Sequence, residues 1–185
     1  MRCASLRYFL FVCAALMFAV FANAQTLPAA APPPPSSMAP VPTALLNAKK
    51  IFISNAGADR GLFPHPFSGD PDRPYNQFYA AMQAWGRYEL VGDPSDADLV
   101  FELQLTGPPG PTNANKVYGA SDPVPMFRLV IFDRKTHYVL WALTESIPIA
   151  ILQKTHDSNF DTALTEITMD LKRLTSAPAT TAANH

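Results

Sequence analysis

The chain has 185 residues, of which 48% are hydrophobic, and its formal net charge is -1 at pH 7. A chain of this length builds one hydrophobic core and is too short for two. No run of lysine and arginine is longer than two residues. The basic surface that neutralises nucleic-acid phosphates is therefore missing, and we expect no nucleic acid among the partners.

The first 24 residues have the pattern of an export signal. Arg2 and Arg7 precede an apolar stretch at residues 8–21, and Ala22-Asn23-Ala24 forms a small-x-small cleavage site. The stretch is shorter than the roughly 20 residues that span a bilayer. We therefore predict cleavage, a periplasmic or secreted location, and no stable membrane span after cleavage. The alternative is that the segment is retained as a membrane anchor.

Both cysteines, Cys3 and Cys13, lie within this segment, so the exported chain has none. Disulfide bonds, thiolate metal sites and a cysteine nucleophile are excluded together. We also expect no lipid on Cys13, because Val12 stands where lipoprotein signals place a small residue.

Three segments follow the predicted signal. Residues 25–43 are rich in proline and alanine, and such a segment cannot bury apolar surface, so it is predicted to be a disordered linker. The globular domain is predicted over residues 44–175. The Ala/Thr-rich residues 176–185 are predicted to form a flexible tail.

The first half of the domain predicts a strand, a helix and two more strands. An apolar run at residues 49–55 indicates a strand, and the polar residues 57–74 indicate a loop. Apolar residues at helical spacing then predict a helix that starts near Pro74 and ends at the cap Gly86. Its apolar stripe consists of Tyr75, Phe78, Met82 and Trp85. A short strand is predicted at residues 88–91 and a longer strand at residues 97–106.

Residues 126–148 carry the clearest sheet pattern and predict a hairpin with a polar turn at residues 133–136. Val139, Trp141 and Leu143 fall on one face of the second strand. We expect Trp141 to pack in the core against the helix that ends at Gly86. A long, proline-rich connection at residues 107–125 precedes the hairpin.

A second helix is predicted to begin at Asp157 and Ser158 and to continue through Leu174. The elements then follow the order β-α-β-β-β-β-α. The predicted fold class is α+β, with a single domain in which a mostly antiparallel sheet carries two helices on one face.

Several short motifs mark turns and core positions. They are the strand at residues 49–53, the segment at residues 85–88, Ala97-Asp98-Leu99-Val100, Asp133-x-x-Thr136 and Leu140-Trp141. Over residues 49–174 this pattern resembles uncharacterised secreted and periplasmic bacterial domains similar to the TolB N-terminal domain and to CsgG-like envelope proteins. The resemblance implies an envelope setting and a partner-binding role without catalytic residues. The chain departs from CsgG-like proteins in lacking a lipid-attachment motif, and from TolB in lacking a propeller domain.

The sequence contains no nucleophile elbow, phosphate-binding loop or dinucleotide-binding turn. The alternative to a binding module is a loop-based hydrolase or metal-dependent enzyme that uses His65 with Asp59, Asp70 or Asp72. The histidines lack metal-site spacing and the aspartates lack the pattern of a calcium loop, so we predict no metal and no cofactor.

The hairpin face opposite the helices is predicted to be partly apolar. Val130, Phe132, Tyr138 and Leu140 fall on it and form the predicted binding site, with Val100 beside them. Exposed apolar patches on the order of a few hundred Å2 usually mark interaction sites. The predicted function is thus an exported non-enzymatic binding or assembly module of the bacterial cell envelope. Its predicted partner is another envelope protein or a small apolar ligand.

The alternative for this face is that a long loop folds over it and buries it. Residues 57–74 and 107–125 are both long enough. The apolar residues available as cover are Leu62, Phe63, Phe67, Val117 and Tyr118.

Overall fold

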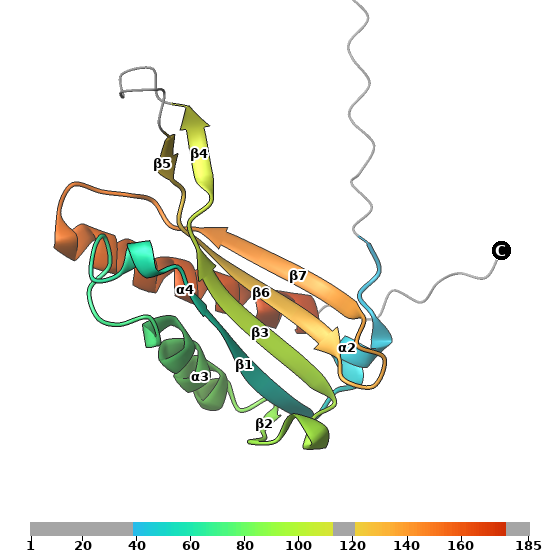
Figure 1. Cartoon of the computed structure of the whole chain (residues 1–185). Coiled ribbons are helices and arrows are strands. Elements are labelled where there is room, and N and C mark those ends of the chain that lie inside the picture. Colours follow the sequence, from blue (N-terminus) through green and yellow to red (C-terminus); the bar gives the residue numbers. More distant parts are fainter. Residues whose placement is uncertain (1–38, 113–120, 177–185) are drawn as a thin grey trace, which may run out of the picture. The chain divides into compact units, whose positions relative to one another are not determined.

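The computed structural model describes residues 39–112 and 121–176 (Figure 1). The predicted signal peptide, the predicted linker as far as residue 38 and the predicted tail from residue 177 lie outside the described residues.

Five strands form the central sheet in the order β2-β1-β3-β6-β7. Their bounds are β1 (Lys50–Ala58), β2 (Glu89–Leu90), β3 (Leu99–Thr106), β6 (Met126–Asp133) and β7 (Val139–Ser146). β1 pairs parallel with β2 and β3, whereas β3 with β6 and β6 with β7 pair antiparallel. The antiparallel pairings include more residues. The predicted α+β fold with a mostly antiparallel sheet is therefore confirmed, and the parallel pairing of β1 is an addition to it.

The described residues include the α-helices α2 (Thr43–Asn47), α3 (Arg73–Trp85) and α4 (Gln153–Ser176). α3 packs on β1 and β3, and α4 packs on β6 and β7. Figure 1 shows α4 running behind the sheet. Apart from α2 and the short elements below, the order of strands and helices is the predicted β-α-β-β-β-β-α.

α3 begins and ends where the sequence indicates. A proline stands in its first turn, at Pro74, and Gly86 ends it in a left-handed conformation with φ 67°. The Gly86 N–H donates to the carbonyl of Met82. Glycine adopts this φ without the steric cost that other residues meet, and so it ends the helix.

α4 begins at Gln153, so the predicted start at Asp157 and Ser158 is wrong. Tertiary contacts hold the additional turn. Gln153 Nε2 donates to the carbonyl of Pro66 at 2.7 Å. His156 is buried, and its Nδ1 accepts the Ala150 N–H at 3.2 Å. Packing of this kind stabilises helical turns that no capping motif marks.

The two predicted loops contain short elements. The 57–74 segment includes the 3-10 helix η1 (Arg60–Leu62), and a second 3-10 helix, η2 (Pro94–Asp96), precedes β3. The 107–125 segment includes β4 (Pro109–Thr112) and β5 (Ser121–Pro123), which pair antiparallel in a sheet of their own.

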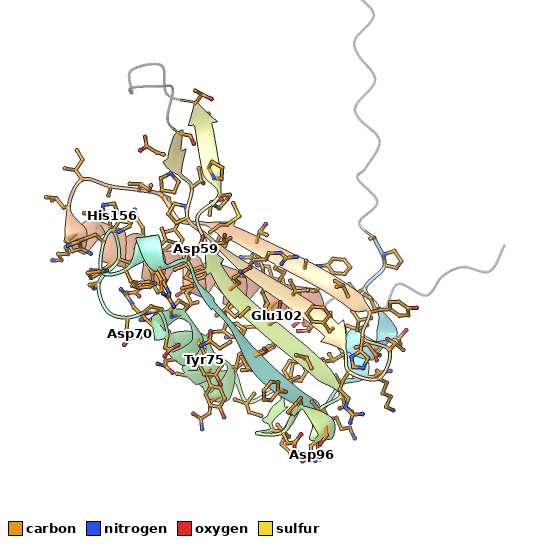
Figure 2. All side chains as sticks on the ribbon, viewed as in Figure 1. Asp59, Asp70, Tyr75, Asp96, Glu102 and His156 are labelled. Carbon is orange, nitrogen blue, oxygen red and sulfur yellow. The ribbon has the colours of Figure 1, made fainter. Side chains whose placement is uncertain are left out.

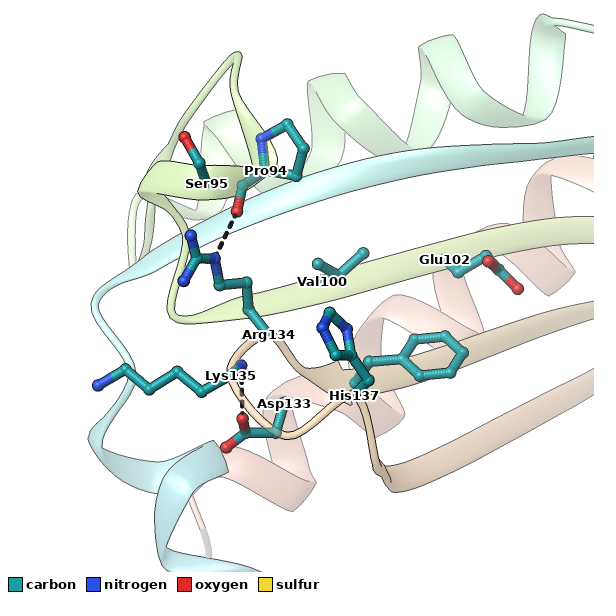
Figure 3. A pocket seen from close by; sticks show the side chains of 9 residues that line it. Pro94, Ser95, Val100, Glu102, Asp133, Arg134, Lys135 and His137 are labelled. Atoms are coloured by element: carbon teal, nitrogen blue, oxygen red, sulfur yellow. Dashed lines mark hydrogen bonds between the residues drawn. The ribbon is translucent and has the colours of Figure 1, made fainter.

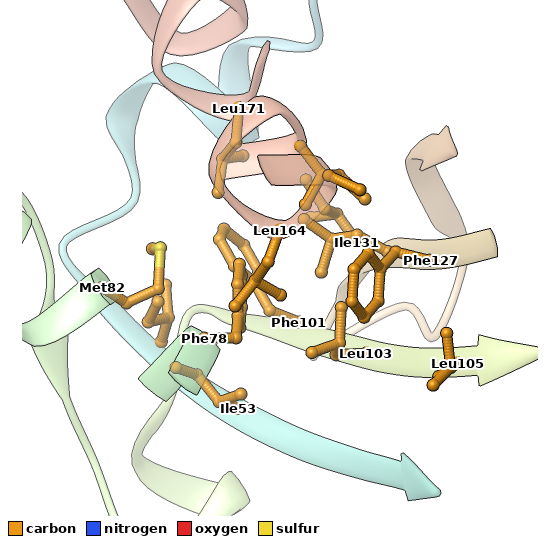
Figure 4. Packing of buried hydrophobic residues seen from close by; sticks show 14 of the residues in the cluster. Ile53, Phe78, Met82, Phe101, Leu103, Leu105, Phe127, Ile131, Leu164 and Leu171 are labelled. Atoms are coloured by element: carbon orange, nitrogen blue, oxygen red, sulfur yellow. The ribbon is translucent and has the colours of Figure 1, made fainter. Parts of the chain in front are cut away.

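The core lies between the sheet and the two helices (Figure 4). Phe78 and Met82 of α3 and Leu164 of α4 pack against Phe101 of β3. The Phe127 and Phe160 rings meet edge to face, with centroids 5.0 Å apart. Such contacts between aromatic side chains add to the stabilisation that burial alone provides.

Trp141 packs against the core as predicted, but it is only half-buried. The helix that packs on its strand is α4, so the predicted packing against α3 is wrong. The reason is the strand order, which places β7 at the edge of the sheet, whereas α3 lies over β1 and β3.

Arg73 joins α3 to α4. Its guanidinium donates to Asp157 at 2.7 Å and to Asp161 at 2.8 Å, and it lies 4.1 Å from the centroid of the Phe160 ring. Asp157 also accepts the Ser68 N–H at 3.0 Å. Burial alone would raise the pKa of Asp157, but the hydrogen bonds from Arg73 and Ser68 outweigh it and hold this pKa well below its usual range.

This pKa shift predicts that the protein loses stability on acidification. A carboxylate with a lowered folded-state pKa stabilises the fold above its unfolded pKa of about 3.9 and loses that effect as the pH falls further. Asp157→Asn should be less stable than wild type at neutral pH, and the difference should shrink in acid. Urea unfolding at both pH values measures it. Asp161→Asn is the control, because its side chain is 56% exposed against 23% for Asp157; a pH-independent loss for Asp157→Asn would contradict the assignment.

Candidate functional site

The sheet face opposite α3 and α4 is called the open face below. No helix packs on it within the described residues, and Figure 2 shows Glu102 near its middle. Its side chains are mixed in polarity. They include Val100, Glu102 and Gln104 of β3, Arg128, Val130 and Phe132 of β6, and Val139, Ala142 and Thr144 of β7.

Two of the predicted binding residues lie on the open face in β6. Val130 stands between Glu102 and Ala142 and is 2% exposed, so it forms the floor of the face and has little surface for contact. Phe132 stands between Val100 and Val139 and is half-buried, which leaves part of its ring available.

The other two predicted binding residues, Tyr138 and Leu140, lie at a β-bulge at the start of β7. Ile131 pairs with Trp141 but Phe132 pairs with Val139, so β7 has one extra residue here. The extra residue is Leu140, which packs against the core, so its predicted place on the open face is wrong. Bulges shift side-chain alternation in this way. Tyr138, just before β7, is 74% exposed, and Val139, which the sequence assigned to the opposite face, is 56% exposed.

A hollow of about 710 Å3 lies at the end of the open face next to the β6–β7 turn (Figure 3). It is open to one side and combines apolar with charged side chains. Its lining includes Pro94, Val100, Glu102, Phe132, Arg134 and His137. Its turn members, Arg134 and His137, were not predicted, because turn residues give no pattern that shows which way their side chains point.

The β6–β7 turn fixes the rim of this hollow. Asp133 Oδ1 accepts the N–H groups of Lys135 and Thr136, both at 2.8 Å, and the bond from Thr136 is the main cause that lowers the pKa of Asp133. Arg134 Nε donates to the carbonyl of Pro94 at 3.2 Å. His137 has φ 60°, a left-handed conformation that is uncommon outside glycine, and Figure 3 shows its ring beside Val100.

Asp98 ties the same end of the sheet together. Its Oδ2 accepts the N–H groups of Lys50 and Lys49 at 3.0 and 2.9 Å, and these bonds lower the pKa of the carboxyl. Its carbonyl accepts the Arg134 N–H at 3.2 Å. The motif aspartates Asp98 and Asp133 are thus structural residues.

The residues of the predicted enzyme alternative each hold a loop in place. His65 Nδ1 lies 3.2 Å from Gln153 Oε1. Asp59 accepts the Gly107 N–H, Asp70 accepts the Asp72 N–H, and Asp72 accepts the amide of Asn55. In the part of the chain that the structure describes, no group of three or more His, Cys, Asp or Glu residues could hold a metal ion. None of these contacts joins His65 to one of the three aspartates.

The 57–74 segment covers the core and leaves the open face uncovered. Leu62 and Phe67 are buried in the core, and Phe63 stacks near Phe67 and Phe160. Val117 and Tyr118, the other predicted cover, lie outside the described residues. As for membrane association, no helix within residues 39–112 and 121–176 has the length and apolar character to cross a bilayer.

Exposure separates Tyr138, one of the predicted binding residues, from the core. Tyr138→Ser should change the free energy of unfolding by less than about 0.5 kcal/mol, as surface substitutions do. Phe101→Ala, at the fully buried centre of β3, should cost about 3–5 kcal/mol. Chemical denaturation of the two variants measures both values. A loss comparable to that of Phe101→Ala would show that Tyr138 is a packing residue.

No protein-family model matches the sequence, and a search of curated proteins finds no significant match. Among solved structures, the chain is similar to a DUF330 protein of Xanthomonas campestris, with 15% identity and a TM-score of 0.43 over 67% of this chain and 81% of that one. It is also similar to dodecameric PelC of Paraburkholderia phytofirmans, with 14% identity and a TM-score of 0.40 over 70% and 89%. Lipoprotein GNA1162 of Neisseria meningitidis gives 13% identity and a TM-score of 0.34 over 65% and 99%. The structural neighbours thus include DUF330 and lipoprotein structures, and at these values they assign no function to this chain.

Proposed function

We propose that the chain is an exported, non-enzymatic binding module of the bacterial cell envelope, and that its open face binds another envelope protein. The observation that carries this proposal is the exposed Val139, which pairs with Phe132 of the hollow on the open face, together with the exposed Tyr138 that precedes it in the chain. Aromatic side chains of this kind are the usual anchors of protein interfaces.

The hollow suits a protein surface better than a small apolar ligand. Sites for small ligands enclose most of the ligand surface. This hollow is open, and charged side chains from Glu102, Arg134 and Lys135 stand around its apolar part. An apolar centre with a polar rim is the usual composition of a protein interface.

The rim is also pre-organised. Asp133 closes the turn with two hydrogen bonds, and Arg134 is fixed through its backbone N–H and its Nε. Groups that are already ordered lose less conformational entropy when a partner binds, so the same contacts give a higher affinity.

The envelope setting rests on the export pattern of residues 1–24 and on the resemblance to TolB-like and CsgG-like domains, and both remain part of the proposal. An exported chain that loses both cysteines with its signal, and whose described residues include no group that could hold a metal ion, is consistent with a binding role.

Site-specific cross-linking in the producing cell tests this function. A photoreactive residue at position 138 should give a discrete cross-linked product, and Val139→Asp in the same chain should reduce its yield about tenfold, since a charge placed in an apolar contact costs more than 1 kcal/mol. The control position is Thr162, which is exposed on α4, on the other side of the sheet. Products that are identical at both positions, or unaffected by Val139→Asp, would rule out the open face.

A further inference from the structure

β7 forms one edge of the sheet, and no strand within the described residues pairs with its outer side. β7 is the last strand in the order, and it runs over 8 residues, whereas β2 at the opposite edge has 2. Edge strands are usually protected against pairing by proline, by lysine or by being short. β7 contains no proline and no basic residue, and its one charge is Glu145. Its bulge lies at the Val139 end, which leaves the remainder regular.

The register shows which backbone groups of β7 point outward. The Ile147 N–H donates to the carbonyl of Pro125 at 2.8 Å, so residue 147 forms a hydrogen-bonded pair toward β6. Hydrogen-bonded pairs alternate along an antiparallel ladder. Residues 145, 143 and 141 therefore bond to β6 as well. The N–H and C=O groups of Ala142, Thr144 and Ser146 point away from the sheet.

The core is incompletely covered along this edge. Trp141 and Leu143 pack against the core from β7, yet both remain only half-buried under α4. A further strand beside β7 would place alternate side chains next to them and complete their burial. Burial of apolar area is the main favourable contribution to most protein association.

The charge along the edge is acidic. Burial, together with the nearby carboxylates of Asp170 and Glu166, raises the pKa of Glu145. Asp170 pairs with Arg173 at 2.7 Å, but no hydrogen bond or ion pair from the described residues reaches Glu145 or Glu166.

Glu166 and Asp170 lie on the side of α4 that is next to Glu145 of β7. The opposite side of the helix faces α3, where Lys172 lies over the Trp85 ring and Asp161 binds Arg73. A strand that docks on β7 therefore meets Glu145, Glu166 and Asp170 with its helix-facing side chains.

We propose that β7 docks an extended strand of a partner protein in antiparallel orientation. The strand carries apolar residues opposite Trp141 and Leu143 and a lysine or arginine opposite Glu145. Strand addition of this kind draws affinity from backbone hydrogen bonds and selectivity from alternate side chains. A second copy of β7 would supply the apolar residues but also a second set of carboxylates, so charge complementarity favours a basic partner. The edge is distinct from the open face, and neither proposal depends on the other.

Binding of a synthetic peptide to the full-length protein tests the inference. The probe is a fluorescent peptide with the core Ser-Lys-Ser-Val-Thr-Ile-Thr, in which lysine stands opposite Glu145, valine opposite Leu143 and isoleucine opposite Trp141. It should bind saturably in fluorescence anisotropy. Replacing its lysine with glutamate should abolish the signal, and Glu145→Gln should weaken binding about threefold at low salt, the usual effect of a partly exposed ion pair. Asp96→Asn, an exposed carboxylate on η2, is the matched control and should have no effect.

Two further variants, one of the protein and one of the peptide, test the backbone hydrogen bonds separately from the side-chain contacts. Thr144→Pro removes an outward N–H and leaves the ladder to β6 intact, as edge positions tolerate. It should weaken binding about tenfold, which corresponds to one lost backbone hydrogen bond. A peptide N-methylated at the residues that face Ala142 and Thr144 should fail in the same way on the unaltered protein. Three outcomes would each overturn the proposal: equal affinity for the N-methylated peptide, no binding of the probe, or a dimer in sedimentation that the probe does not dissociate. None of these outcomes would change the cross-links at residue 138.

Discussion

The packing of α3 and α4 on one face of the sheet is the constraint on which the rest of the structure depends. Two helices can cover one face of a five-stranded sheet, and Arg73 sets their spacing by bonding Asp157 and Asp161 while it stacks on Phe160. Arg73 and Asp157 are partly buried, so the loss of either side chain would leave the other charge without its partner in a poorly solvated place. With the helices held there, the opposite face and the outer side of β7 remain available for other molecules.

The sequence predicted those features that follow from short-range patterns. α3 is an example, because its apolar stripe, its proline and Gly86 all act within one element. β3 was also predicted, since strict alternation marks a regular strand. In β6, however, Val130 is buried although it was predicted to be a binding residue. The start of α4 was not, because its first turn depends on bonds from Gln153 to a loop that is distant in sequence.

The candidate site was predicted only in part, for two physical reasons. The bulge adds one residue to β7, so Leu140 turns into the core and Val139 takes the open face, and alternation alone cannot locate such an insertion. The parallel pairing of β1 with β3 is the second reason, because strand order is a property of the whole chain. In the observed strand order β7 lies at the edge, so α4 packs on the strand of Trp141 where α3 was predicted.

Asp98 couples the opening of three segments at the end of the sheet near the hollow. Through one carboxylate and one carbonyl it joins the start of β1 to the start of β3 and to the β6–β7 turn, which are far apart in the chain. Proteins open in contiguous units, and segments that share hydrogen bonds open together. We therefore expect these three segments to open and to exchange their amide protons together, so that the rim of the hollow is lost only when all three open.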